Sequence, residues 1–542
     1  MLSYRKLAMR VLGRPLHTGG IDSPRPASQR AAAFILTAAM LTTLAAPAFA
    51  DIWRIEDGDI TVKAGETEGT NKVSQGTTID KVDTDTIITN QNKDTASSHT
   101  VTIEAKDKDD KVEVTLKDVN IDTSSRNKAA VSVTGEGDTN IKLDGDNALK
   151  SDIYRSGIYG SGSLTISGGE NDSLTAQGGS GANGISSSGS LTISGGTVTA
   201  NGDDGGRGIS SSGSVTISGG STVTANGGSG TISGGDGICS SGGVTISGGS
   251  TVTANGGNGG TISGGDGIRS GGGLTVSDGT VTAKGGNGDS KDGYGGDGIR
   301  SGGVVTISGN TVNAAGGYGG KVGGYGICSF DRVAISGGTV EAAGGNGSTG
   351  GGSGIYSSVI DLSGSLELTA KAGSPTGKAL LQNGRELDLD TIKDKLGPGA
   401  KVTATDANGD SKQVSIPRPV EPEEPVIPEE SSSSSDGGSA TPSAPASPLP
   451  GLTVTDKDGQ RISYTSTQSG NTLTVCVGRL TASLRASLAA LRQLRAEGIE
   501  TITFQTILCS TTLSVDELLA MGGEDAEAVL THRFTDSSLT VG

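Results

Sequence analysis

Short runs of alternating apolar and polar residues occupy most of the chain between residues 51 and 416. From residue 157 to residue 372 these runs recur as one phrase, whose plainest copy is GISSSGSLTISGGTVTANG at residues 184–202. Its Gly-Ile, Leu-Thr-Ile and Thr-Val-Thr-Ala steps predict three short strands, because alternation with a period of two places apolar side chains on one face of a strand. The isoleucine of the Gly-Ile step recurs at intervals of 24 to 31 residues, at Ile158, Ile185, Ile209, Ile238, Ile268, Ile299, Ile327 and Ile355. A repeat of this length, with glycine between the strands, predicts an all-β, three-sided parallel β-helix with one copy per coil.

Two features of the repeat indicate how the coils stack. Asn201, Asn226 and Asn255 occupy one position in successive copies, which predicts a ladder of hydrogen-bonded side-chain amides along the axis. The segment between the third strand and the next Gly-Ile step varies in length from copy to copy. Insertions into a solenoid map to one edge, and that edge is often the binding edge.

The segments on either side of the regular repeats carry the same pattern in a less regular form. Residues 51–156 are predicted to form the N-terminal cap and the first, irregular coils, and residues 373–416 the C-terminal cap, because the open ends of a solenoid need atypical cover. Residues 417–450 contain nine of the fifteen prolines and a run of five serines. This composition is typical of an extended, disordered linker.

Residues 451–542 return to a globular pattern and predict a small α+β module. A hairpin is expected around residues 462–477, a strand around residues 502–504 and a helix that starts at the capping box of Ser514 and Glu517. A longer helix is expected from leucines at helical spacing, with Gly498 at its end; these are Leu480, Leu484, Leu488, Leu491 and Leu494. No feature of the module indicates its binding partner.

The four cysteines divide between the repeats and the C-terminal module. Cys239 and Cys328 lie three repeats apart, which is about 14 Å at a coil spacing of about 4.8 Å and too far for a disulfide. Cys476 and Cys509 are candidates for a disulfide in an oxidising compartment.

Residues 1–50 have the pattern of a secretory signal peptide. Basic residues precede an apolar stretch at residues 31–44, and Ala48, Phe49 and Ala50 form a cleavage site before Asp51. A signal-anchor helix is the alternative, and the threonines of the stretch argue against it. We therefore expect an extracellular protein, secreted or held at the surface of a bacterial cell, with no membrane span in the mature chain.

Composition narrows the possible functions. Glycine accounts for 93 of the 542 residues and aromatic residues for only 3%, which fits a thin core of Val, Ile and Leu. The net charge of −17 argues against a nucleic-acid partner, because phosphate contacts need clustered Lys and Arg.

An acidic column runs through the repeats. Asp236, Asp266 and Asp297 each stand two residues before the isoleucine of the Gly-Ile step, so their carboxylates are expected about 5 Å apart. Calcium accepts several oxygen ligands, so the column is a candidate metal site for calcium. The alternative needs no ligand: Arg269 and Arg300 follow Asp266 and Asp297 by three residues and are placed to pair with them.

Tyrosines and lysines gather in the long segments of the same repeats. Tyr294, Tyr318 and Tyr325 fall in neighbouring copies, with Lys291 and Lys321 nearby. Aromatic faces flanked by polar groups suit the stacking of sugar rings, so this edge, with Arg269 and Arg300, is a candidate carbohydrate-binding site. The alternative is that these tyrosines are simply exposed in glycine-rich loops.

Residues 112–149 contain VEVTLKDVNIDTSSRNKAAVSV followed by LDGDNAL, and SLTISGG repeats come after them. Over about residues 55–400 this text resembles the secreted bacterial family of carbohydrate-binding domain-containing proteins. The resemblance implies a right-handed parallel β-helix, bound calcium, and binding of acidic or cellulosic plant polysaccharide such as polygalacturonate or cellulose.

Taken together, these features predict a non-catalytic protein that binds a polysaccharide or cell-surface glycan. A structural adhesin or spacer without a sugar site is the second hypothesis, and a polysaccharide lyase is the third. Parallel β-helices can carry lyases, but the strand faces here are Ser, Thr and Gly, and Asp266 and Asp297 with the two arginines are the sole candidate catalytic set.

Overall fold

A computed structural model of the chain describes residues 51–417 and most of residues 452–541, with gaps at 457–459, 463, 470, 478, 480, 507–509, 522–526 and 534–535. The chain divides into two compact units, residues 1–422 and residues 423–542, which are described separately. The predicted signal peptide at residues 1–50 and all but the first residue of the predicted linker at residues 417–450 lie outside the described residues.

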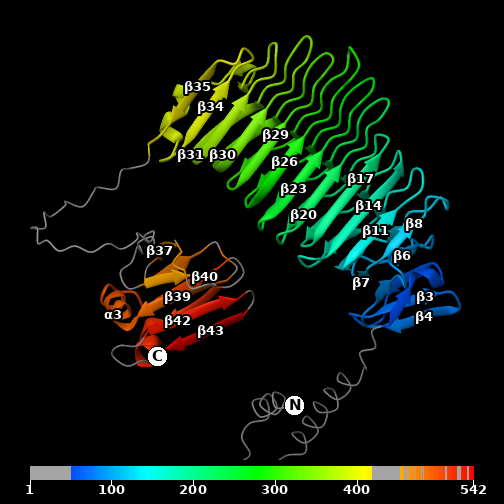
Figure 1. Cartoon of the computed structure of the whole chain (residues 1–542), viewed down its shortest axis with the longest axis horizontal. Helices are drawn as coiled ribbons and strands as arrows, with labels where there is room; N and C mark the ends of the chain where they lie inside the picture. The colour runs from blue at the N-terminus through cyan, green and yellow to red at the C-terminus, as the bar shows by residue number, and fades with distance from the viewer. Residues whose placement is uncertain are drawn as a thin grey trace, which may run out of the picture. The chain divides into compact units, whose positions relative to one another are not determined.

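The first unit is a parallel β-solenoid of about 13 turns (Figure 1). Its regular part has three columns of strands, and each strand pairs with its equivalent one coil later. The first column holds β12 (Ile158–Gly160), β15 (Ile185–Ser187), β18 (Ile209–Ser211), β21 (Ile238–Ser240), β24 (Ile268–Ser270) and β27 (Ile299–Ser301). The second holds β13 (Ser163–Ser167), β16 (Leu191–Ser194), β19 (Val215–Ser218), β22 (Val244–Ile246), β25 (Leu274–Val276) and β28 (Val305–Ile307). The third holds β14 (Ser173–Ser180), β17 (Thr197–Asp203), β20 (Thr222–Asn226), β23 (Ser250–Asn255), β26 (Gly279–Lys284) and β29 (Thr311–Ala315). β30 (Ile327–Ala343) and β31 (Ile355–Lys371) each run through all three columns.

The predicted strand register is confirmed. Ile158 pairs with Ile185 and Ile185 with Ile209, so the isoleucines of the Gly-Ile step stack along the axis. They are fully buried, and so are the apolar positions of the other two columns. Each fully buried Val, Leu or Ile contributes roughly 1.5–3 kcal/mol, and stacking joins the small contribution of each coil into one continuous core. The predicted amide ladder is also present, with Asn226 Nδ2 2.8 Å from Asn201 Oδ1 and Asn255 Nδ2 2.8 Å from Asn226 Oδ1.

The N-terminal coils continue the same parallel pairing. They consist of β1 (Ile52–Arg54), a 3-10 turn (Ile55–Asp57), β2 (Ile60–Ala64), β3 (Asn71–Gln75), β4 (Thr78–Asp83), β5 (Ile87–Thr89), β6 (Val101–Glu104), β7 (Lys111–Lys117), β8 (Asn120–Asp122), β9 (Val131–Thr134), β10 (Asp138–Asp144) and β11 (Asp146–Lys150). β2, β3 and β4 pair antiparallel, which ends the parallel stack. The indole Nε1 of Trp53 donates to Asp83 Oδ2 at 2.8 Å and ties this cap together.

The C-terminal end of the solenoid is closed in a similar way. It consists of β32 (Leu380–Gln382), β33 (Arg385–Glu386), a 3-10 helix (Leu389–Lys395), β34 (Lys401–Thr405) and β35 (Ser411–Ser415). β34 extends the parallel stack, and β35 pairs antiparallel to it. An antiparallel last strand leaves no parallel edge of the regular kind for another coil to join.

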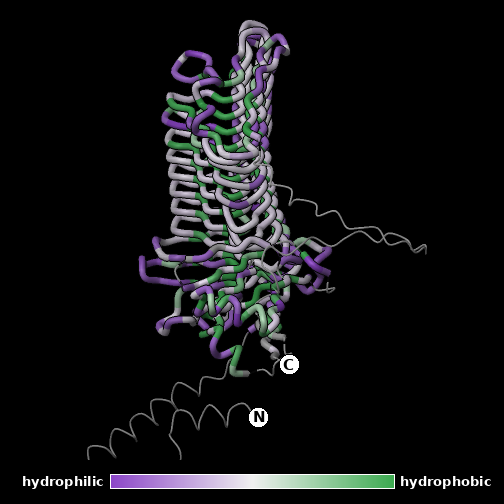
Figure 2. Tube along the Cα trace, turned by 90° about the vertical axis from the view of Figure 1, so that its left-hand side faces the viewer, coloured by the Kyte–Doolittle hydropathy of each residue, from purple (hydrophilic) through white to green (hydrophobic). Residues whose placement is uncertain are grey.

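A glycine-rich layer forms a further side of the solenoid between the third column and the next first-column strand. In each coil the chain runs out through one glycine and returns through another, and their backbones bond alternately: Gly257 N donates to Gly235 O, Gly265 N to Gly257 O and Gly286 N to Gly265 O, each at 2.8 Å. The same alternation continues to Gly373. In Figure 2 the stacked turns of this layer are pale, because glycine and serine lie near the middle of the hydropathy scale.

The second unit has two four-stranded sheets and two short helices. One sheet has the order β36 (Leu452–Thr455), β39 (Thr481–Ser487), β42 (Glu527–Arg533) and β43 (Asp536–Val541), and the other β37 (Thr465–Ser469), β38 (Thr472–Cys476), β40 (Thr501–Gln505) and β41 (Ser510–Ser514). The helices are α3 (Leu488–Ala496) and α4 (Val515–Met521). The amide of Glu517 donates to the Ser514 hydroxyl at 3.4 Å, as the predicted cap requires.

The predicted start of the first helix was wrong. Leu484 lies in β39, and α3 begins only after Ser487, whose hydroxyl accepts a hydrogen bond from the amide of Ala490. A spacing of four residues keeps two side chains on one face of a strand as well as of a helix, so the leucine spacing did not distinguish the two. The predicted helix end is confirmed, since Gly498 has a φ of +91° just beyond α3.

Two further predictions concern cysteines and membrane helices. Cys509, the expected partner of Cys476, lies outside the described residues, so that disulfide stays a prediction. Among the described residues, none of the helices combines the length and the apolar character needed to cross a membrane.

Candidate functional site

The three aspartates of the acidic column are buried at the corner where the glycine-rich layer meets the first column. Asp236, Asp266 and Asp297 are only 5%, 2% and 3% exposed. Each Oδ1 accepts the backbone N–H of the corresponding residue one coil later: Asp236 from Asp266 at 2.9 Å, Asp266 from Asp297 at 2.8 Å, and Asp297 from Tyr325 at 2.7 Å. Aspartate at this position therefore bonds one coil to the next.

The second carboxylate oxygen of each aspartate faces an arginine. Arg269 Nη2 lies 2.8 Å from Asp266 Oδ2, and its Nε lies 3.5 Å from Asp236 Oδ2, so one guanidinium bridges two coils. Arg300 Nη1 lies 3.0 Å from Asp297 Oδ2. Arg207, which the sequence pattern does not mark, has its Nε 3.3 Å from Asp236 Oδ2. The pairing of aspartate with arginine proposed as the alternative is therefore present in the structure.

Burial dominates the electrostatics of this corner. It raises the pKa of Asp297 to about 7, and the nearby Asp266 carboxylate adds to the effect while Arg300 opposes it. Burial likewise raises the pKa of Asp266, against the attraction of Arg269. Removing a carboxylate from water disfavours its charged form, and the arginines compensate only in part.

The acidic column does not suit a calcium ion. Calcium needs six to eight oxygen ligands, but here each Oδ1 already accepts a backbone N–H and each Oδ2 faces a guanidinium. Across all the residues that the structure describes, no three His, Cys, Asp or Glu side chains converge in a way that could hold a metal ion. Binding of calcium by this chain stays a prediction, and these three aspartates are poorly arranged for it.

The exposed side of the same corner is a shallow groove of about 320 Å³, which we call the Tyr–Arg groove. Its side chains come from Asp266, Arg269, Tyr294, Asp297, Arg300 and Tyr325, with Ser263, Val322 and the backbone of loop glycines completing it. The structure thus brings together four of the seven residues predicted to bind carbohydrate and two of the three predicted to bind metal.

The aromatic groups of the groove are held by their neighbours. Tyr294 is 45% exposed, and Lys321 Nζ lies 5.6 Å from its ring centroid in a cation–π contact. Tyr325 is partly buried and stacks on Tyr356, with ring centroids 5.0 Å apart and planes inclined by 16°. The stacking covers one face of the Tyr325 ring, so Tyr294 offers the more accessible ring.

Two predicted residues lie away from the groove. Tyr318 is 47% exposed, and its amide donates to Asn287 Oδ1 at 2.9 Å further out in the glycine-rich layer. Lys291 lies beside Gly320 of the next coil and does not line the groove. The predicted site was therefore larger than the groove. Tyr318 and Lys291 are near the groove residues in sequence, but they lie in long loops that extend beyond the groove.

Sequence reasoning missed two aromatic residues beside the groove. Tyr356 stacks on Tyr325, and Phe330, 54% exposed, lies 5.3 Å from the Arg300 guanidinium. A signal for Tyr356 was available, because it occupies the same position after the Gly-Ile step as Arg300 and Cys328 and therefore pairs in register with them.

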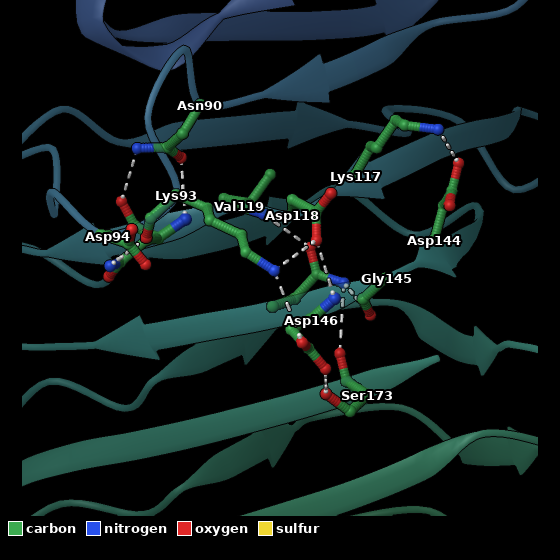
Figure 3. Close-up of polar contacts among 12 residues, drawn as sticks. Asn90, Lys93, Asp94, Lys117, Asp118, Val119, Asp144, Gly145, Asp146 and Ser173 are labelled. Carbon is green, nitrogen blue, oxygen red and sulfur yellow. Dashed lines mark hydrogen bonds and ion pairs between the residues drawn. The ribbon is translucent and has the colours of Figure 1, made fainter. Parts of the chain in front are cut away.

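Acidic side chains of the early coils form a second polar cluster (Figure 3). Lys93 Nζ lies 3.8 Å from both Asp118 Oδ1 and Asp146 Oδ2, and the other Asp146 oxygen accepts the Ser173 hydroxyl at 2.8 Å. The Asp146 amide donates to Asp118 Oδ1 at 3.2 Å. As in the acidic column, these groups satisfy one another and join successive coils.

Comparison with known proteins finds a family model that matches part of the chain. Residues 94–350, which span the Tyr–Arg groove and most of the solenoid, match the family model described as carbohydrate-binding domain-containing protein. No curated protein and no solved structure matches the chain.

Proposed function

We propose that this β-solenoid, whose residues 94–350 belong to the carbohydrate-binding domain-containing protein family, binds a polysaccharide in the Tyr–Arg groove without cleaving it. The observation that carries the proposal is the convergence of exposed aromatic and guanidinium groups at one corner of a family member. Tyr294, Arg269 and Arg300 line the same groove although they come from two coils.

The chemistry of the groove suits a sugar ring. The ring of Tyr294 provides a flat apolar face, and its hydroxyl provides a polar edge. Each arginine has five N–H donors, and the aspartates engage only part of them, so donors remain for hydroxyl or carboxylate oxygens of a ligand. Stacking together with directed hydrogen bonds is how a shallow groove distinguishes a sugar from water.

The groove is poorly equipped for catalysis. Hydrolysis of a glycoside needs two carboxyl groups on opposite sides of the bond, but the carboxylates that line the groove, Asp266 and Asp297, share one column and are held by arginines. Burial also raises the pKa of Cys328 to about 12 and that of Cys239 above its ordinary value, so neither thiol is a nucleophile. These features favour binding over hydrolase activity and over catalysis by a thiol.

We further propose that the protein acts outside the cell, secreted or attached to the bacterial surface. This rests on the signal-peptide pattern of residues 1–50. Its ligand would then be a polysaccharide or a cell-surface glycan in the surroundings of the cell.

A glycan array tests the proposed function. The wild-type chain is compared with Tyr294→Ala and Arg269→Lys, and Thr251→Ala, an exposed position of the third column, is the matched control. Lysine keeps the charge beside Asp266 but loses the planar fork of donors. We expect each groove variant to lose at least about tenfold in affinity, as truncation of an aromatic or arginine hot spot does, and the control to bind normally.

The array, together with an assay for cleavage of polygalacturonate, separates the alternative functions. Absence of binding by the wild-type chain, with and without added calcium, would favour a structural adhesin or spacer. Release of unsaturated oligosaccharides from polygalacturonate would overturn the non-catalytic assignment. Binding that disappears on chelation and returns with calcium would support the predicted calcium requirement.

A further inference from the structure

We propose that a second groove at the same corner of the solenoid, nearer the N-terminus, contacts the same ligand, so that the ligand is a linear polysaccharide laid along the solenoid axis. This inference rests on the proposed function. The second groove, of about 580 Å³, is lined by Lys128, Tyr154, Arg155, Ser156 and Tyr159 among others, and we call it the N-terminal groove. Neither sequence analysis nor the first groove points to it.

The two grooves occupy equivalent positions in different coils. Tyr159 pairs with Ser186, Ser186 with Ser210, Ser210 with Cys239, and Cys239 with Arg269, so Tyr159 and Arg269 share one outward column, four coils apart. At about 4.8 Å per coil they are separated by about 19 Å. The residues between them in this column, two serines and a cysteine, are small. Arg207, whose Nη1 lies 3.5 Å from the Ser210 hydroxyl, reaches over this stretch and adds N–H donors along the path of the ligand.

Tyr154 is held outward by a strained backbone. Its φ of 60° lies in the left-handed region, which is costly for a residue with a Cβ and has to be held by the surrounding structure. Its amide donates to Ser180 O at 2.9 Å, and a Cβ added at Gly181 would lie 2.9 Å from the ring, so this glycine makes room for the ring. The side chain is nevertheless 78% exposed. The backbone of Tyr154 is therefore fixed while its ring is left in water, where a ligand in the groove can reach it.

Tyr159 supplies a second ring. It is 44% exposed, and its neighbours in the column one coil before and one coil after are Ser132 and Ser186. These small residues leave both faces of the ring uncrowded along the axis. The Tyr–Arg groove is built in a similar way, because Tyr294 lines it together with Arg269 and Arg300, which point outward from the first column.

Hydrogen-bond donors complete the N-terminal groove. Arg155 Nε contacts Asn127 Oδ1 at 3.2 Å, and among the described residues no carboxylate forms an ion pair with this guanidinium. Lys128 Nζ lies 3.1 Å from Asp59 Oδ2. Arg155 therefore has free donors for hydroxyl or carboxylate oxygens, as Arg269 and Arg300 have in the first groove.

The test measures the affinity of the full-length chain for glycans of graded length, from disaccharide to polymer. These glycans are taken from the polysaccharide that binds best on the array. Two variants remove the aromatic rings of the N-terminal groove. Tyr159→Ser matches its neighbours in the column, and Tyr154→Gly removes the ring while relieving the left-handed backbone, so its melting temperature should not fall. Thr251→Ala again serves as the control.

We expect each variant to lose at least about tenfold in affinity for the polymer, because one long chain that engages two grooves gains avidity. For fragments too short to span about 19 Å the loss should be much smaller, since such fragments retain the Tyr–Arg groove. Tyr294→Ala should lower the affinity for both lengths.

The outcomes distinguish this inference from the proposed function. If the polymer binds and both N-terminal variants bind it as the wild type does, the second groove is wrong and the proposed function stands. If these variants lose polymer and fragment affinity equally, the grooves do not share one chain. If no glycan binds at all, both proposals fail.

Discussion

Substitution of a single glycine in the glycine-rich layer should destabilise the solenoid strongly. In Gly265→Ala the new Cβ would lie 1.9 Å from Gly235 O and 2.4 Å from Gly235 C, whereas an ordinary contact begins at 3.4 Å. The oxygen belongs to the backbone of the preceding coil and cannot rotate away. The two coils would have to separate by 1.5 Å, the difference between 3.4 and 1.9 Å.

The cost has two parts. Overpacking of a rigid interior costs roughly 1–3 kcal/mol. Separation of the coils also strains the hydrogen bonds that join them, such as those from Gly257 N to Gly235 O and from Gly237 N to Asp266 O, each worth about 0.5–1.5 kcal/mol. The total is about 2–6 kcal/mol, which is large for a solenoid whose coils each bury few side chains.

Gly249→Ala is the matched control. Gly249 has a φ of +70° and nothing within 4 Å of an added Cβ, so this substitution carries only the left-handed backbone penalty of roughly 1–2 kcal/mol. Urea unfolding followed by circular dichroism gives the overall loss. Amide hydrogen exchange of residues 256–267 shows whether the loss is local. If Gly265→Ala proves no more destabilising than Gly249→Ala, the layer is not held by backbone contact between coils.

Two further substitutions test the ladders that join the coils. Burial raises the pKa of Asp297 from 3.8 to about 7, so between these pH values the folded chain retains a proton that the unfolded chain has lost, and stability should fall as pH rises through this range. Asp297→Asn should weaken that dependence, seen as a smaller fall in melting temperature from pH 5 to pH 8; an unchanged fall would show that Asp297 is not the titrating group. Asn226→Ala removes its amide hydrogen bonds to Asn201 and Asn255 and should cost about 1–3 kcal/mol in urea unfolding, while Thr251→Ala, on the exposed face of β23, should change little.

The strands and their register were predictable because the solenoid repeats one local rule. Apolar residues recur with period two inside each strand and at a fixed offset from each Gly-Ile step. Equivalent residues of successive copies, such as Ile185 and Ile209, are therefore expected to stack once the copies form coils. The amide ladder followed from the same alignment, because identical side chains at one offset meet along the axis.

The glycine-rich layer was not predictable in the same way. Its contacts are between backbone atoms, such as Gly265 N and Gly257 O, and glycine carries no side chain whose periodicity could reveal them. A glycine-rich stretch has the composition of a flexible loop whether or not it is hydrogen-bonded. Only the three-dimensional register shows that the outgoing and returning segments interlock.

The candidate site was predictable in position but not in detail. The departures from the repeat at Arg269, Tyr294 and Arg300 lie together at one corner, as their spacing from the Gly-Ile step predicts. The sequence left open whether Asp266 faced a cation or an arginine, because both arrangements need the same spacing. Tyr325 was expected to be exposed, but it is partly covered by Tyr356, a contact across coils that no local pattern encodes.

Binding of a polysaccharide in the Tyr–Arg groove can be measured in solution. The most direct measurement is the affinity of the wild-type chain and of the Tyr294→Ala and Arg269→Lys double variant for the best glycan of the array, by titration calorimetry, with Thr251→Ala as the reference. We expect clear binding by the wild type and by the reference, and a loss of at least about tenfold in the double variant. Equal affinity of the double variant and the wild type, with both folded, would contradict it.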